Sequence, residues 1–273
     1  MGRTLYLSES GNKLTVVRDG PSVWVKAEAR AGQRVPVRFL SRVIVIGNVT
    51  LDAGAITLFT ESDIPVVFMN PRAEEVAMAI PYNHKLATHY EEQKVFLASD
   101  ENVERFEQWA GSRRAVGQME ALKRLCRLAA GQIKYGVGEG NYQQMLSRMK
   151  PSSEEKWMVV TGVINNLLRG LIMEHLLKAD LDPHVGVIHR RHNFGLVLDI
   201  CYIMGAEGDL QALQMVRCDK NGCLVARNKN GWFITDEGMR NIAHRFENRR
   251  KALHGVVECI IDELFELMRE LRL

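Results

Sequence analysis

The sequence predicts an α+β protein, with a small N-terminal β-strand domain over residues 1–80 and a larger all-α C-terminal domain over residues 81–273. In the first part, short β-branched or alternating runs lie between turn residues, as strands do. In the second part, apolar residues recur at helical spacing almost throughout. The 273 residues and 46% hydrophobic content are normal for a soluble globular protein with one large or two ordinary domains.

The expected strands lie in the runs LTVV, SVWVKA, VIVIGNVTL and IPVVFM, between residues 14 and 69. Turn residues at 19–21, 47–48 and 70–71 punctuate these runs, which favours separate short strands. Residues 54–62 predict one short helix within this part. The segment IPYN at residues 80–83 is the expected linker to the second domain.

Helices are expected in the second domain over residues 90–98, 103–109, 116–134, 154–179, 194–204 and 237–271. The turn DKNG at residues 219–222 introduces a small hairpin, expected at residues 224–234. The last helix carries an apolar stripe. Packing against its own domain is the default interpretation, and a partner-binding tail is the alternative.

The compartment follows from what the sequence lacks. No apolar run approaches the roughly 20 residues of a membrane span, and the first residues lead into a strand rather than a signal peptide. The 5 cysteines are odd in number and scattered through apolar contexts, which predicts reduced structural thiols. We therefore expect a cytoplasmic protein without a membrane partner.

The charge balance alone does not indicate nucleic-acid binding, because 36 Lys+Arg against 33 Asp+Glu give a net charge of only +3. The distribution says more, since basic residues cluster at positions 113–127, 190–191 and 240–251. For any single cluster, ordinary helix-surface charge is the better explanation. Taken together, the clusters predict salt-dependent contacts with DNA phosphates, which we assign to Arg190, Arg191, Arg245 and Arg249.

Two segments carry candidate chemistry. The segment LDPHVGVIHRRHNFGLVLD, residues 181–199, places His189 and Asp199 on neighbouring elements beside two arginines, which is half of a site for metal-assisted phosphodiester chemistry. A lone histidine beside an apolar run is more often structural. The segment YGVGEGNYQQML, residues 135–146, offers a second acid, Glu139, among alternating glycines. Its alternative reading is a glycine-rich turn with a solvated glutamate.

Taken together, the two segments resemble the CRISPR-associated integrase that captures foreign DNA fragments as new spacers, a family of metal-dependent DNA endonucleases. The resemblance covers nearly the whole chain. It includes LYLSESGNKLTVVRDG and the stretch from VPVRFL to VVFMN in the strand domain, and GVGEGN, VINNLLRGLIMEHLL and LDPHVGVIHRRHNFGLVLD in the helical domain. The family's asparagine in the fourth of these motifs falls on Asn165.

The resemblance implies that Glu139, His189 and Asp199 are the catalytic residues and hold Mg²⁺ or Mn²⁺. Where the family usually has a second acid three residues after the first, this chain has Tyr202. Three outcomes stay open: Asp199 alone completes the site, a displaced acid such as Glu207 or Asp209 substitutes, or metal binding is impaired. His189 is either a metal ligand or a general acid on the leaving oxygen.

The implied activity is insertion of DNA fragments into a CRISPR array, by attack of a DNA 3′-hydroxyl on a phosphodiester. The implied partners are double-stranded DNA, a second copy of the chain joined through the N-terminal domain, and a small ferredoxin-like second adaptation protein. One alternative is a catalytically impaired DNA-binding scaffold of the adaptation complex. Another, independent of the resemblance, is a metallohydrolase of small phosphoesters.

Overall fold

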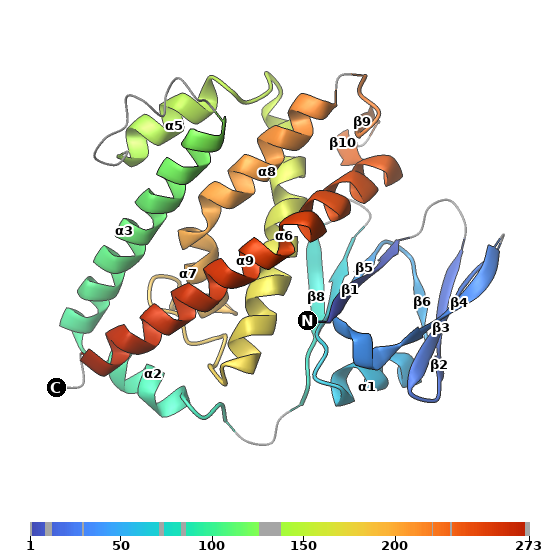
Figure 1. Cartoon of the computed structure of the whole chain (residues 1–273), viewed down its shortest axis with the longest axis horizontal. Helices are drawn as coiled ribbons and strands as arrows, with labels where there is room; N and C mark the ends of the chain where they lie inside the picture. The colour runs from blue at the N-terminus through green and yellow to red at the C-terminus, as the bar shows by residue number, and fades with distance from the viewer. Residues whose placement is uncertain are drawn as a thin grey trace.

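The computed structural model describes residues 2–8, 13–28, 30–70, 74–82, 86–125, 138–219, 221–229 and 231–270. Strands and one short helix make up the N-terminal part, and helices dominate the remainder, so the predicted α+β class is confirmed. Figure 1 shows the N-terminal, strand-rich part on one side of the molecule and the helical part on the other.

The strands form two four-stranded sheets. The first has the order β1 (Arg3–Ser8), β5 (Leu40–Ile46), β7 (Val66–Met69), β8 (Glu75–Ala79), and only the β7–β8 pair in it is antiparallel. The second has the order β4 (Arg30–Pro36), β3 (Ser22–Ala27), β2 (Leu14–Asp19), β6 (Thr50–Leu51). Gly20, at φ 59°, turns β2 into the antiparallel β3. A short 3₁₀ turn, η1 (Val37–Phe39), leads into β5.

The predicted short helix is α1 (Ala53–Glu61). Asp52 caps it, because its carboxylate accepts a hydrogen bond from the backbone N–H of Ala55.

From Val43 to Ile46, strand β5 is apolar on both faces because both faces are buried. Val43 and Val45 lie in the core shared with the second sheet and α1, whereas Ile44 and Ile46 lie in the core shared with the helices. Alternate residues of a strand point to opposite faces, so the first sheet serves two cores at once. The boundary between residues 80 and 81 stays a prediction, since this sheet packs directly against the helical part.

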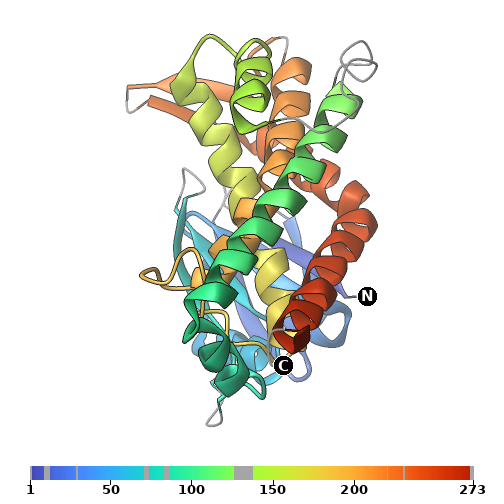
Figure 2. The ribbon, with the colours of Figure 1, turned by 90° about the vertical axis from the view of Figure 1, so that its left-hand side faces the viewer.

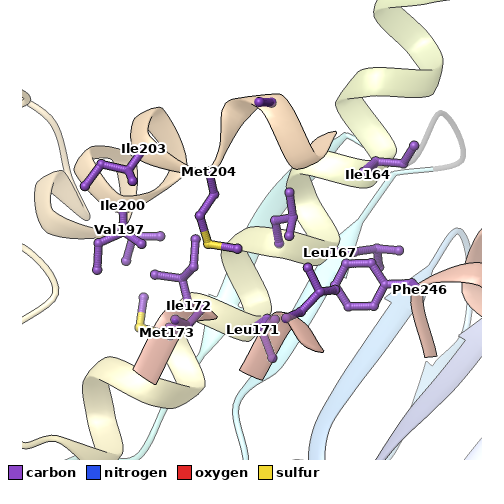
Figure 3. Close-up of a cluster of buried hydrophobic side chains, with 14 of the residues drawn as sticks. Ile164, Leu167, Leu171, Ile172, Met173, Val197, Ile200, Ile203, Met204 and Phe246 are labelled. Carbon is purple, nitrogen blue, oxygen red and sulfur yellow. The ribbon is translucent and has the colours of Figure 1, made fainter. Parts of the chain in front are cut away.

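The helical part contains α2 (Tyr90–Leu97), α3 (Asp100–Leu125), α5 (Glu139–Ser147), α6 (Glu154–Lys178), α7 (Gly195–Ile203), α8 (Gly205–Cys218) and α9 (Asp236–Glu270), with the hairpin of β9 (Val225–Asn228) and β10 (Gly231–Ile234) between the last two helices. Helix α6 is central: it contacts α7, α8, α9, β5 and β10. Figure 3 shows its apolar side chains packed with those of α7 and with Phe246 of α9. Figure 2 shows α3 on the side facing away from the strands.

Two helices differ from expectation. The stretches predicted at 103–109 and 116–134 belong to one continuous helix, α3, and the end of the second lies outside the described residues. Helix α8 was not predicted, because its glycines interrupt the apolar pattern. Gly208 allows close packing there, since an added Cβ would lie 2.5 Å from Oδ1 of the Asn165 side chain on α6.

Two further expectations concern the cysteines and the membrane. Cys201, Cys218, Cys223 and Cys259 form no disulfide within the described part of the chain, and Cys126 lies outside it. Across the residues that the structure describes, no helix combines the length and the apolar character needed to cross a bilayer.

Candidate functional site

Asp199 anchors the loop that carries the candidate histidine. Its side chain lies on α7 and is fully buried. One carboxylate oxygen accepts from the backbone N–H groups of Val187 and Ile188, and the other accepts from the backbone N–H of His189 at 3.0 Å. These bonds tie the loop to α7, and they leave the carboxylate no exposed face.

His189 is oriented by the same carboxylate. Its Nδ1 lies 2.6 Å from Oδ1 of Asp199, and its side chain is 30% exposed. A carboxylate partner fixes the tautomer with hydrogen on Nδ1, so the lone pair of the neutral ring lies on Nε2. No partner of Nε2 is found among the described residues. The ring therefore presents a proton acceptor at the surface.

The close approach of two glycines builds this loop. A Cβ on Gly186 would lie 2.4 Å from the backbone of Gly195, and a Cβ on Gly195 would lie 2.7 Å from the carbonyl oxygen of His189. Phe194, which precedes α7, adopts a left-handed conformation at φ 58°. The loop can therefore press against the start of α7 only because both positions lack side chains.

Glu139 is held by side chains from two helices. It is the first residue of α5, and Nε and Nη2 of Arg114 on α3 donate to its two oxygens at 3.0 and 3.1 Å. The amides of Gln118 and Gln143 donate to the same carboxylate. The Arg114 hydrogen bonds are the largest of the effects that lower the pKa of Glu139 to about 2. Glu139 therefore stays ionised at neutral pH.

Tyr202 also contacts Arg114, the arginine that pairs with Glu139. Nη1 of Arg114 donates to the backbone carbonyl of Tyr202, and the guanidinium lies 4.6 Å from the centre of its ring. Tyr202 is 38% exposed near the end of α7. Arg114 thus connects Glu139 to the position at which the resemblance implies a second acid.

The structure does not bring the three predicted ligands together. Within the described residues, the only group of three metal-ligand side chains whose atoms lie within 4.8 Å of one another is His175, His254 and Glu258. Glu139 is instead paired with Arg114, and Asp199 is enclosed by the loop that it anchors. That Glu139, His189 and Asp199 together hold one ion therefore stays a prediction, which the contacts of these side chains do not support.

In the group of His175, His254 and Glu258, the two histidines are hydrogen-bonded between α6 and α9, and the Glu258 carboxylate lies 4.0 Å from Nδ1 of His175. Nε of Arg250 donates to Nε2 of His254 at 3.1 Å, so the neutral ring carries its hydrogen on Nδ1. That Nδ1 lies 2.5 Å from Nε2 of His175. A metal ion on Nδ1 of His254 would compete with this proton. The group is therefore better explained as a polar network than as a metal site.

The two displaced acids differ. Glu207 forms a two-bond ion pair with Arg249, at 2.7 Å for each bond. Asp209 accepts a hydrogen bond from the Tyr142 hydroxyl at 2.9 Å, and burial raises the pKa of its carboxyl. Glu207 is thus committed to an arginine, whereas Asp209 lies near enough to Glu139 and Arg114 to interact with their charges.

The four predicted DNA-contacting arginines fall into two pairs. Arg190 and Arg191 are exposed on the histidine loop, and Nε of Arg190 donates to the carbonyl of Val187. Arg245 bonds Asn241 and Cys218, and Arg249 pairs with Glu207. Of the four arginines, only Arg190 and Arg191 therefore form an exposed basic surface.

Arg114 and Gln118 are the site residues that sequence reasoning missed. Arg114 was assigned to a basic helix surface, although it meets Glu139 across 25 residues of sequence. Their spacing is the one signal that was present: residues four apart lie on the same face of a helix, which makes them joint partners for one group.

Comparison with known proteins identifies the fold. The family model described as CRISPR associated protein Cas1 matches residues 5–130. A CAS1 protein from Thermotoga maritima superposes with a TM-score of 0.79 at 19% identity, over 97% of each chain. The resemblance to Cas1 proteins is confirmed. No curated protein matches the sequence.

Two further solved structures share the Cas1 fold. A casposase bound to integration product superposes with a TM-score of 0.70 at 15% identity, over 91% of this chain and 82% of the casposase. A chain of a Cas6-RT-Cas1–Cas2 complex gives a TM-score of 0.75 at 14% identity, over 98% of this chain and 35% of the larger one. At these identities, the likeness is one of fold.

Proposed function

We propose that this Cas1 protein is a DNA integrase and endonuclease of spacer acquisition, which inserts DNA fragments into a CRISPR array by 3′-hydroxyl attack on a phosphodiester. The observation that carries the proposal is the pair of His189 and Asp199, with Nε2 exposed on a loop that also carries two exposed arginines. The Cas1 family match and the fold shared with a casposase bound to integration product support it.

The chemistry is general base catalysis by His189. With its hydrogen fixed on Nδ1, the ring accepts the proton of the attacking hydroxyl at Nε2, and the buried Asp199 stabilises the imidazolium that forms. The hydroxyl oxygen bonds to phosphorus as the bond from phosphorus to the 3′-oxygen of the target strand breaks, and the imidazolium gives its Nε2 proton to that leaving oxygen. Arg190 and Arg191, which follow His189 directly, hold the phosphate backbone beside Nε2.

The Mg²⁺ or Mn²⁺ implied by the resemblance does not fit these residues as they stand. The Asp199 carboxylate is buried and accepts three backbone hydrogen bonds, and Arg114 donates to both oxygens of the Glu139 carboxylate. Tyr202 adds a phenol, which is a poor ligand for hard cations. No catalytic step is therefore assigned to a divalent ion.

The proposed partners are double-stranded DNA, a second copy of the chain through the strand domain, and a small ferredoxin-like adaptation protein. The fold shared with a Cas6-RT-Cas1–Cas2 complex supports a second adaptation protein as partner. Strands β1 and β8 are the two edges of the first sheet, and Val76 on β8 is 69% exposed. These edges are the surfaces we assign to protein contacts.

A second candidate function is a DNA-binding scaffold of the adaptation complex that has lost chemistry. The ion pair between Arg114 and Glu139, together with Tyr202 at the acid position, favours it. No observation on the described residues favours a metallohydrolase of small phosphoesters, because the three predicted ligands do not converge.

The test is the joining of a labelled duplex with a free 3′-hydroxyl to a CRISPR repeat. We expect His189→Ala to abolish joining and to leave DNA binding intact. His192→Ala is the matched control, because His192 lies exposed on the same loop with its ring 5.6 Å from that of His189. Binding without joining in the wild-type protein would support the scaffold, and full joining by His189→Ala would reject the proposed chemistry.

A further inference from the structure

We propose that the guanidinium of Arg114 is the resident cation of this Cas1 site, so that Glu139 binds no Mg²⁺ or Mn²⁺ in the folded chain. The inference refines the proposed function, but it rests on contacts that are independent of His189. The resemblance implies a metal ion beside Glu139, and the Arg114 guanidinium takes the place of that ion.

The first argument is that the Glu139 carboxylate is saturated. Nε and Nη2 of Arg114 donate to its two oxygens, and the amides of Gln118 and Gln143 add one hydrogen bond each. Two carboxylate oxygens offer about four acceptor positions, and four N–H donors fill them. A divalent ion would have to displace a two-bond arginine pair to reach this carboxylate.

The second argument is that Arg114 is itself held in place. Its third nitrogen donates to the backbone carbonyl of Tyr202, and the Tyr202 ring lies under the guanidinium. Its side chain is 15% exposed, whereas the paired Glu139 side chain is 51% exposed. Gly205 leaves space for the arginine, since a Cβ there would lie 2.7 Å from Nη1. Arginine is fixed here by partners on two helices, α5 and α7.

The third argument is the charge of the site. Arg114 neutralises Glu139, and a guanidinium keeps its charge at any physiological pH. Asp209, an acid close enough to interact with the charge of Arg114, is hydrogen-bonded by the Tyr142 hydroxyl. Mg²⁺ gives up its water reluctantly and needs near-ideal oxygen geometry, so a neutralised carboxylate offers it little. The site has a cation already.

The experiment is a titration of the DNA-free protein with Mn²⁺, followed by the electron paramagnetic resonance signal of the free ion. The variants are Glu139→Gln, Arg114→Gln and the double variant. Arg113→Gln is the matched control, because Arg113 is the adjacent residue on α3 and pairs with Glu263 instead. Circular dichroism and thermal unfolding check that each variant is folded.

We expect the wild-type protein, Glu139→Gln and Arg113→Gln to bind Mn²⁺ equally weakly, with no saturable site up to about 1 mM, the weak end of protein sites for divalent cations. Arg114→Gln should bind one Mn²⁺ at least about tenfold more tightly, because it frees a carboxylate that a cation then neutralises. The double variant should lose that gain.

Tight binding by the wild-type protein that Glu139→Gln removes would overturn the inference, whether or not Arg114→Gln folds. A folded Arg114→Gln protein that gains no site would overturn it as well. The proposed function fails by a different measurement, since joining by His189→Ala does not depend on Mn²⁺ affinity. We expect His189→Ala to bind Mn²⁺ as weakly as the wild-type protein.

Discussion

Nδ1 of His189 lies 2.6 Å from Oδ1 of Asp199, and the same carboxylate accepts hydrogen bonds from three consecutive backbone N–H groups. One buried acid therefore both shapes the loop and orients the ring that the loop carries. Asp199 touches no solvent, so its effect on a substrate passes through His189, which makes it a positioning residue.

The first prediction separates these two tasks of Asp199. Asp199→Asn keeps the size of the side chain and one hydrogen-bond acceptor. It should lower the joining rate about 10²- to 10⁴-fold while DNA affinity stays unchanged, because the His189 ring loses its fixed tautomer and its negatively charged partner. Asp199→Ala should also destabilise the fold by about 3 kcal/mol or more, since buried N–H groups lose their acceptor. Joining kinetics and urea unfolding measure the two effects. An Asp199→Asn protein that joins DNA at the wild-type rate would contradict this account.

The second prediction concerns the basic loop. Replacing Arg190 and Arg191 together by alanine should weaken binding to all duplex sequences alike, and should reduce the slope of log affinity against log salt by about 1 per lost phosphate contact. Both side chains are exposed beside His189. The salt dependence of duplex binding, measured by fluorescence anisotropy, tests this.

The third prediction is the contrasting behaviour of Arg249, which was assigned to DNA from sequence. Its guanidinium forms two bonds of 2.7 Å with Glu207, so it is committed within the fold. Arg249→Ala should lower the melting temperature and leave the salt slope of DNA binding unchanged. A reduced slope of log affinity against log salt in Arg249→Ala would show that Arg249 contacts DNA.

Much of this architecture was predictable, for a physical reason. Strand β5 and helix α6 are buried on nearly all sides, so long apolar runs in the sequence predict both elements. The neighbourhood of His189 and Asp199 was predictable from segment 181–199, whereas the contact between Gly186 and Gly195 that shapes the loop is seen only in the structure. The partner of Glu139 was not predictable, because a surface arginine and a site arginine look alike until the fold brings α3 to α5. Helix α8 was not predicted because its glycines interrupt the apolar pattern, and one of them, Gly208, packs closely against Asn165 of α6.

The fourth prediction extends the Mn²⁺ titration to Tyr202. In the Arg114→Gln background, Tyr202→Asp should tighten Mn²⁺ binding further, because a second carboxylate supplies another hard oxygen ligand near Glu139. In the wild-type background, the same change should have little effect, since the new carboxylate would pair with Arg114. The four proteins form a cycle, and equal gains in both backgrounds would contradict the role given to Arg114.

The last prediction concerns pH and the network between α6 and α9. Burial, together with the neighbouring His175, lowers the pKa of His254 from 6.5 to about 4, and burial lowers the pKa of His175 as well. The charged groups around the pair are Glu174, Lys178, Arg42, Arg250 and Glu258. The unfolded chain takes up a proton at a higher pH than the folded chain does.

Stability should therefore be complete above pH 6.5 and should fall as the pH drops from 6.5 towards about 4, where His254 titrates in the folded state. Thermal unfolding across this range measures the loss. His254→Gln cannot take up the proton, so its melting temperature should depend less on pH. His244→Gln is the matched control, because His244 is exposed on the same helix and bonds only Asn248 among the described residues. If His254→Gln and His244→Gln follow the same pH dependence as the wild-type protein, the buried pair does not set the acid stability of this fold.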